Sequence, residues 1–322
     1  MDRRTLAGVN PTDNAIVVRE LTKRYGRRLA VDRLSFDVPV GVVAGFIGPN
    51  GAGKSTTLAM LVRLVRPTGG SAAVLGHDIA TSSEYIRHVG ALIEAPAFYR
   101  SLTARQNLGL ILKIGRHDPR RIDAVLDEVG LAERATDRYG TYSAGMKQRL
   151  GIAAALLGDP DVLLLDEPAS GLDPVGIADM RKLLTSVARE GRTVLVSSHA
   201  LADLEQICDW LVMIDRGACL YQGAADQLLA AGTAQVHATP SAAEDLERLR
   251  GVLTAAGHPD VAISGDHIVV AADGLEARAV AVAVNREAAT AGIALARLET
   301  VAASLEDRYL EMVAHRQDGG QP

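Results

Sequence analysis

A glycine-rich segment between an apolar run and a helix-like run constrains this chain more than any other feature. Residues 48–56 read Gly-Pro-Asn-Gly-Ala-Gly-Lys-Ser-Thr and follow the largely apolar residues 42–47. A strand, a glycine-rich turn and a helix form the context in which G-x-x-x-x-G-K-[ST] cradles phosphate. Glycines let successive backbone N–H groups point at phosphate oxygens, at the positive end of the helix dipole. The segment therefore predicts a nucleotide-binding site.

The polar side chains of this segment have expected roles in holding a nucleotide and Mg²⁺. Lys54 can reach β- and γ-phosphate oxygens as a mobile point charge. The hydroxyl of Ser55 is placed to ligate Mg²⁺, and that of Thr56 adds a phosphate contact. The residues expected to cradle the phosphates are Gly48, Pro49, Asn50, Gly51, Ala52, Gly53, Lys54, Ser55 and Thr56.

Composition and charge narrow the class of protein. The 322 residues suffice for two domains, and a formal net charge of -5 argues against nucleic-acid binding through a broad basic surface. Cys208 and Cys219 form neither a metal pair nor a disulfide framework, so we expect reduced core residues of a cytosolic protein. No signal peptide and no run of roughly 18–20 apolar residues is recognisable. Any membrane role is therefore expected to come through a partner.

Alternating apolar runs and helical patterns predict an α/β sheet layered with helices. Strands are expected at 15–20, 34–38, 162–165, 193–197 and 210–215, and helices at 175–190 and 200–207. Residues 162–165 form a continuous apolar run, which is typical of a strand buried on both faces. From about Thr103 to Gly140 apolar residues recur at three-to-four spacing, which favours helices.

The pattern of predicted strands and helices changes near residue 231, and the sequence that follows is rich in alanine. The segments that follow are expected in the order β-α-β-β-α-β, which is ferredoxin-like, with a last helix at 301–314. A module of this kind is more often a structural or dimerisation element than a drug site. The predicted divisions are a flexible tail at 1–14, a first domain at 15–230 with a helical subdomain at about 95–158, an accessory domain at 231–314 and a flexible tail at 315–322.

Two adjacent carboxylates, Asp166 and Glu167, end the predicted buried strand. Successive side chains of a strand point to opposite faces, so the two are expected to do different work. Asp166 is placed to hold Mg²⁺ beside Ser55, directly or through water, and Glu167 to orient and deprotonate the attacking water. An acidic turn after a core strand is common by itself, and the phosphate-binding segment upstream favours the catalytic interpretation.

A Ser-x-Gly helix start, Ser143 to Gly145, lies between these motifs. An exposed hydroxyl and free N–H groups at the start of a helix predict a second anion site. By itself the signal is weak, because every N-capped helix has this form.

The order of these motifs resembles the ATPase subunit of an ABC transporter. The phosphate loop comes first, the Ser-x-Gly segment follows about 90 residues later, and residues 166–174 resemble that family's Walker B and D-loop run. His199 stands where the family has its switch histidine, and Tyr25 matches the aromatic residue that stacks on adenine. The resemblance covers about residues 15–230 and implies a P-loop NTPase of ABC type, with a mixed sheet, an antiparallel β part and a helical subdomain.

The resemblance implies a head-to-tail homodimer with two ATP molecules in its interface. One protomer supplies the phosphate loop with Lys54, Tyr25, Asp166, Glu167 and His199. Its partner supplies Ser143 and Gly145 to the γ-phosphate, with Asp173 coupling the two sites. ATP then closes the dimer and hydrolysis opens it. His199 without these neighbours would be read as a surface or packing residue.

The chain departs from the family pattern at two places. The first departure lies in the family's signature, the segment that contains Ser143 and Gly145. Here it has Tyr142, Ala144 and Met146 in place of the common residues. The main-chain donors remain, so function is expected to survive. Glu94 stands where most members carry a glutamine that senses Mg²⁺, water and the membrane subunit. Its extra negative charge has two opposite readings: stronger metal ligation, or slower hydrolysis through repulsion of phosphate.

The surroundings of Glu94, the signature segment and the C-terminal residues 304–310 together resemble the bacterial subgroup that exports bacitracin, lantibiotics and related antibiotics. The resemblance implies an ATP hydrolase that powers drug, antibiotic or peptide export through a separate transmembrane permease. The subunit would lie on the cytoplasmic face of the membrane, and residues 94–115 would dock the permease. No nucleic-acid partner is expected.

Two other classes compete with this reading. A soluble ABC-type ATPase acting as a mechanical or assembly module would carry the same nucleotide motifs. However, the tandem ATPase units of translation factors and the long heptad insertion of repair ATPases are both missing from the sequence. A P-loop kinase would leave the segments around Ser143 and His199 without a role.

Overall fold

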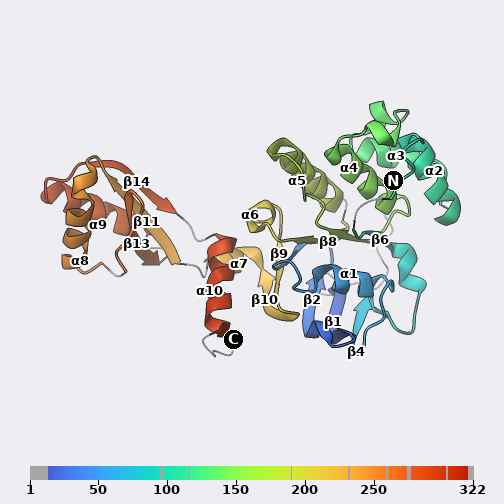
Figure 1. Ribbon diagram of the computed structural model, residues 1–322, viewed down its shortest axis with the longest axis horizontal. Helices are drawn as coiled ribbons and strands as arrows, with labels where there is room; N and C mark the ends of the chain where they lie inside the picture. The colour runs from blue at the N-terminus through green and yellow to red at the C-terminus, as the bar shows by residue number, and fades with distance from the viewer. Residues whose placement is uncertain are drawn as a thin grey trace. The chain divides into compact units, whose positions relative to one another are not determined.

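The computed structural model describes residues 14–94, 97–115, 117–189, 191–230, 233–258, 260–273, 277–301 and 304–317 (Figure 1). Contacts divide the chain into two compact units, one ending at Ala225 and the other beginning at Asp226. Ala95 and Pro96, beside Glu94, lie outside the described residues. So do most of the predicted tails, and the described parts of those tails belong to a strand that starts at Asn14 and a helix that ends at Gln317.

A six-stranded sheet with the order β10-β9-β3-β8-β7-β6 forms the centre of the first unit. Its strands are β3 (Val43–Ile47), β6 (Val89–Leu92), β7 (Val162–Asp166), β8 (Thr193–Ser198), β9 (Trp210–Asp215) and β10 (Ala218–Ala224). All pairs run parallel except β9 with β10. Every residue of β3, β7 and β8 is buried, as expected for parallel strands covered on both faces.

Helices lie on both faces of this sheet, with α1 (Lys54–Leu61) on one side and α5 (Pro174–Arg189) on the other (Figure 1). The sequence predicted β7, β8, β9 and α5 closely but gave no strand at β6 or β10. β10 follows β9 through a tight turn in which Arg216 and Gly217 both have positive φ, a geometry that matches the twist of a hairpin. Short α6 (Leu201–Leu204) follows β8, where a longer helix over 200–207 was expected.

A separate antiparallel sheet with the order β2-β1-β4-β5 packs into the same core. Its strands are β1 (Asn14–Tyr25), β2 (Arg28–Pro39), β4 (Gly69–Val74) and β5 (His77–Asp78). β1 and β2 form a hairpin closed by a turn at Gly26, and both are longer than the strands predicted at 15–20 and 34–38. Both strands are longer than predicted because they pair with each other through several register irregularities. Such pairing leaves no local signal in the sequence.

The helical subdomain contains α2 (Ala104–Gly115), α3 (Arg121–Glu128) and α4 (Ala144–Leu156). The predicted helical stretch to Gly140 is wrong beyond α3, where only short 3₁₀ turns at Ala132–Arg134 and Tyr139–Thr141 occur. Gly130 adopts a φ of +69° just after α3, which is the usual way a helix stops.

The second unit has the predicted order β-α-β-β-α-β. It comprises β11 (Thr233–Pro240), α8 (Leu246–Ala255), β12 (Ala262–Ser264), β13 (His267–Asp273), α9 (Ala277–Thr290) and β14 (Leu295–Val301). The antiparallel sheet has the order β12-β13-β11-β14, and residues from its strands and from both helices form one core.

The last helix, α10 (Leu305–Gln317), starts four residues later than predicted. Val301 still belongs to β14, and Ser304 begins the helix by accepting a hydrogen bond from the Asp307 N–H at 3.2 Å. A short α7 (Ala225–Ala230) spans the boundary between the two units. None of the helices in the described ranges combines the length and the apolar character needed to cross a membrane.

Candidate nucleotide-binding site

The phosphate-binding loop connects the carboxyl end of β3 to the start of α1, as the sequence predicted. Gly53 precedes the helix with a φ of +104°, which L side chains rarely adopt. A Cβ on Gly48 would lie 2.4 Å from the Ile214 carbonyl oxygen, so the loop passes too close to β9 for a side chain. Backbone geometry therefore requires glycine at both positions.

An open cavity of about 370 Å³ lies at this loop. Its lining residues are Tyr25, Arg28, Ala30, Pro49, Asn50, Gly51, Gly53, Lys54, Ser55, Thr56 and Glu167. Tyr25, at the end of β1, is half exposed, and Lys23 Nζ lies 4.8 Å from its ring centroid. The hairpin β1–β2 thus brings an aromatic face to the phosphate loop, although the two are far apart in the sequence. Arg28, the first residue of β2, had no signal in the sequence that pointed to this cavity.

Lys54 is held by its own loop and by one carboxylate. Its Nζ donates to the carbonyl oxygens of Gly48 at 2.6 Å and Pro49 at 3.3 Å. The same nitrogen lies 3.3 Å from Glu167 Oε1, and the side chain is only 6% exposed. An arriving phosphate would have to replace at least one of these partners to take the full charge of the ammonium group.

Asp166 and Glu167 are separated by the backbone rather than by strand alternation. β7 ends at Asp166, and Glu167 has a φ of +48°, so it no longer continues the extended chain. As predicted, the two side chains contact different partners. They do so because the backbone turns at Glu167, and not because neighbouring strand residues alternate between the two faces of a sheet.

Ser197 of β8 joins the two acidic residues, and sequence reasoning missed it. Its fully buried hydroxyl donates to Asp166 Oδ1 at 2.5 Å and accepts from the Glu167 N–H at 3.0 Å. Asp166 and Ser197 are direct partners in the β7–β8 register. The only sequence signal was a pair of serines, Ser197 and Ser198, directly after the apolar residues 194–196.

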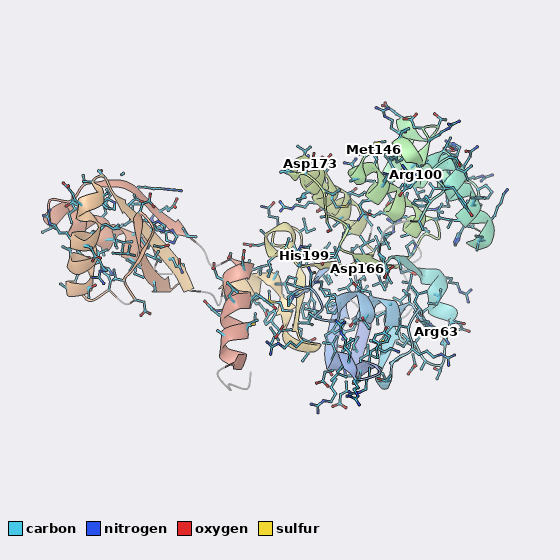
Figure 2. All side chains as sticks on the ribbon, viewed as in Figure 1. Arg63, Arg100, Met146, Asp166, Asp173 and His199 are labelled. Atoms are coloured by element: carbon cyan, nitrogen blue, oxygen red, sulfur yellow. The ribbon has the colours of Figure 1, made fainter. Side chains whose placement is uncertain are left out.

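Glu167 is the centre of a cluster with the other two predicted catalytic residues. Its Oε2 lies 2.8 Å from His199 Nδ1, while its Oε1 faces Lys54. His199 follows the carboxyl end of β8, beside the end of β7 where Asp166 lies (Figure 2). Glu167 is thus placed between a cation and an imidazole at the cavity wall, where it can accept a proton from a bound water.

Ser143, Gly145 and Asp173 lie together in a different open pocket, of about 450 Å³. Ser143 caps α4 by accepting from the Met146 N–H at 3.3 Å, and Asp173 Oδ1 accepts from the Gly176 N–H at 2.7 Å. None of the described residues that line this pocket belongs to the phosphate loop. Within one chain, the residues predicted to contact the γ-phosphate, Ser143 and Gly145, therefore lie in a different pocket from the predicted phosphate-binding loop.

The signature substitutions have structural explanations. Ala144 and Met146 line the same pocket as Ser143, and Met146 lies in the first turn of α4 (Figure 2). Tyr142 is buried, and its hydroxyl donates to the Arg134 carbonyl at 2.7 Å. Tyr142 is therefore a core residue in front of the signature, and its burial raises its pKa.

Glu94 is exposed and is not among the described lining residues of the phosphate-loop cavity. It lies two residues beyond Leu92, which pairs with Leu165 of β7, and therefore near the sheet edge that carries Asp166. Its φ is +65°, so the chain turns at this residue. No cluster of three or more His, Cys, Asp or Glu side chains suited to a metal occurs in the described part of the chain. The structure thus brings Ser55 into the cavity but does not gather Ser55, Asp166 and Glu94 into a protein-only cage.

The family model, the related sequences and the related structures all point to the same family. The family model described as ABC transporter matches residues 31–170. The bacitracin transport ATP-binding protein of Bacillus licheniformis is 45% identical over 216 residues, 66% of this chain and 71% of that protein. The daunorubicin resistance ATP-binding protein of Streptomyces coeruleorubidus is 38% identical over 223 residues, 68% of this chain and 71% of that protein.

A lantibiotic transport ATP-binding protein of Streptococcus pyogenes is 38% identical over 200 residues, 62% of this chain and 86% of that protein. Among solved structures, the ATP-binding subunit of an ABC transporter superposes with a TM-score of 0.59 at 30% identity, covering 66% of this chain and 91% of that one. The part of this chain that these matches cover is similar in length to the first unit, which ends at Ala225.

Proposed function

The chain belongs to the ATP-binding subunits of ABC transporters, and we propose that it powers the export of antibiotics or peptides through a separate transmembrane permease. The observation that carries the proposal is the cluster of Lys54, Glu167 and His199 at a phosphate-loop cavity. Relatives named for bacitracin transport, lantibiotic transport and daunorubicin resistance support antibiotic export over a soluble assembly module.

ATP would occupy the 370 Å³ cavity with its adenine against Tyr25 and its phosphates on the loop. Lys54 would exchange the Gly48 and Pro49 carbonyls for phosphate oxygens and neutralise charge as it develops. Glu167 would take the proton of the attacking water, and His199 would hold that carboxylate in position through its 2.8 Å contact.

The donor set at the cavity fits Mg²⁺. Mg²⁺ prefers oxygen ligands and is usually held by one or two carboxylates together with substrate phosphates, not by an all-protein cage. Ser55 offers a hydroxyl in the cavity, and Asp166 is a nearly buried carboxylate whose Oδ1 is fixed by Ser197. Held by Ser55 and Asp166, the ion would supply positive charge that neutralises the phosphate groups of the nucleotide. Glu94, outside the cavity lining, is the weakest of the three proposed ligands.

A complete ATP site would need a second copy of the chain. Ser143, Gly145 and Asp173 line their own pocket, away from the phosphate loop of the same chain. In a head-to-tail homodimer this pocket of one copy would cap the γ-phosphate bound by the other. ATP would favour the closed dimer because these contacts exist only while the γ-phosphate is present.

The decisive experiment replaces Glu167 by glutamine. Glu167→Gln is expected to retain ATP binding, lose at least about a hundredfold in turnover and accumulate as an ATP-bound dimer, because the base is lost while the phosphate contacts remain. Asp161→Asn is the matched control, since Asp161 precedes β7, at the end opposite Glu167, where it pairs with His88. Hydrolysis by Glu167→Gln at the parent rate would show that Glu167 is not the base.

The transport part of the proposal needs the permease. We expect the chain to co-purify with a multi-span membrane protein encoded beside it, placing it at the inner face of the membrane. A strain lacking the chain should become more sensitive to a bacitracin-type or anthracycline antibiotic, and Lys54→Ala should fail to restore resistance. Unchanged sensitivity to such compounds would argue against antibiotic export while leaving the ATPase activity intact.

A further inference from the structure

The outer strand of the C-terminal sheet, β14, has one edge without a strand beside it in the described part of the chain. Among the described strands, in the order β12-β13-β11-β14, it pairs only with β11. Such an edge presents a row of backbone N–H and C=O groups that can pair with another strand. With seven residues β14 is longer than β12, the three-residue strand at the other edge of the sheet.

Two opposite charges stand side by side on this strand. Arg297 pairs with Thr239 and Glu299 with His237 in the β11–β14 register, so both side chains lie on the same face of the sheet. They form an ion pair at 2.8 Å, and their side chains are 69% and 37% exposed. Leu298, between them, packs against the domain core instead.

We propose that β14 pairs with β14 of a second copy of this chain, antiparallel and centred on Leu298. A two-fold axis perpendicular to the sheet keeps each face of the sheet on its own side, so strand partners must have residue numbers with an even sum. Centred on Leu298, Arg297 of each copy lies directly opposite Glu299 of the other, and Leu298 meets Leu298 on the core side. Each contact then occurs twice.

Charge complementarity selects this register over its neighbours. Centring the pair on Arg297 would place arginine against arginine, and centring it on Glu299 would place glutamate against glutamate. Like charges directly opposite each other destabilise a strand pair, and opposite charges stabilise it. Charges on edge strands often serve to repel other chains. An Arg-x-Glu pair on one face has another effect. It disfavours the registers that place like charges opposite each other, and it favours the register in which two copies of the strand place Arg opposite Glu.

The geometry also predicts that the pairing is weak in isolation. The β11–β14 register shifts between Thr239 and Pro240, so the regular part of β14 begins near Arg297 and the new ladder is short. Two ATPase subunits held by one transporter would strengthen it through effective concentration. The inference goes beyond the proposed function, because it needs neither ATP nor the phosphate loop.

Sedimentation velocity of the full chain, nucleotide-free and with EDTA, tests this pairing. Arg297→Glu makes a copy with two carboxylates and Glu299→Arg a copy with two guanidinium groups on the strand. Each variant alone should self-associate at least about tenfold more weakly than the parent, because two attractive contacts become two repulsive ones. An equimolar mixture of the two should associate about as tightly as the parent, and so should the doubly swapped Arg297→Glu/Glu299→Arg chain.

The mixture is the matched control for folding, since neither variant could rescue the other if it were merely unfolded. Thermal unfolding and ATP binding of each variant verify that the domains are intact, as neither residue touches the nucleotide cavity. Hydrogen exchange of β14 amides should slow as the parent concentration rises. A parent that stays monomeric without nucleotide up to its solubility limit, or a mixture no tighter than the separate variants, would overturn the proposal. Neither result would affect the ATP-dependent dimer, which Glu167→Gln tests separately.

Discussion

Replacing Ser197 by alanine should damage both the stability and the turnover of this ATPase. The serine hydroxyl is fully buried and makes two hydrogen bonds, one to the carboxylate of Asp166 and one from the backbone of Glu167. A hydrogen bond to a charged group contributes about 1.5–3 kcal/mol and a neutral one about 0.5–1.5 kcal/mol. Asp166 is only 7% exposed, so water replaces little of what is lost. We therefore expect a loss of about 2–4.5 kcal/mol in the free energy of unfolding.

The effect on catalysis follows from the position of Glu167. Its backbone N–H is fixed by Ser197, and its carboxylate must keep its contacts with Lys54 and His199. Without that anchor the carboxylate is held less firmly, and a loss of about tenfold in kcat, or about 1.4 kcal/mol, is expected. KM for ATP should change little, because Ser197 does not line the described part of the nucleotide cavity.

Ser198→Ala is the matched control for both measurements. Its hydroxyl accepts from the Ala200 N–H at 3.0 Å and donates to the Ala200 carbonyl at 3.3 Å, away from both acidic residues. Urea unfolding gives the free energy, and steady-state phosphate release gives kcat and KM. If Ser197→Ala matched Ser198→Ala in unfolding free energy and kcat, the idea that Ser197 positions the acidic pair would be refuted.

Three further perturbations test other parts of the structure. Gly48→Ala should abolish ATP binding in calorimetry, since the new Cβ would lie 2.4 Å from the Ile214 carbonyl oxygen; retained affinity would contradict the close approach. Arg192→Met should lower the free energy of unfolding in urea by about 3–5 kcal/mol, because the Glu128 carboxylate, 2.6 Å from this buried arginine, would lose its cation. Replacing Glu128 by leucine as well should restore part of the loss. Burial raises the pKa of the Cys219 thiol to about 11 from an ordinary value of 9.0, so unfolding releases protons above pH 9. Stability should therefore fall as the pH rises from about 9 to 11. Cys219→Ala should make that slope shallower but not remove it, because burial also raises the pKa of Cys208. An unchanged slope would exclude the Cys219 thiol as one of its causes.

The nucleotide motifs could be read from the sequence because each is local. The turn at residues 48–56 carries its own glycines and its flanking strand and helix, and Ser143 announces a helix start through its own side chain. The apolar run at 162–165 likewise reports a strand buried on both faces. The β-α-β-β-α-β order of the second unit was accessible for the same reason, since each of its elements has a pattern of its own.

Local patterns failed where pairing between distant segments decides the outcome. β10 exists because a tight turn folds it back on β9, and β1 and β2 lengthen because they pair with each other. Beyond α3 the apolar spacing persists in the sequence, yet the chain forms only short 3₁₀ turns there. In each case hydrogen bonds to another segment overrode the local propensity, and beyond α3 these bonds join residues 135–140 to residues 100–105.

The sequence by itself determined that this chain has a phosphate loop, a pair of acidic residues and a signature serine in the order of an ABC-type ATPase. Only the tertiary structure decided that Ser197 ties Asp166 to Glu167, that Ser143 lies in a pocket apart from Lys54, and that β14 forms the edge of its sheet. The physical reason is that a motif needs only neighbours along the chain, whereas strand order, register and shared pockets depend on which distant surfaces are buried together.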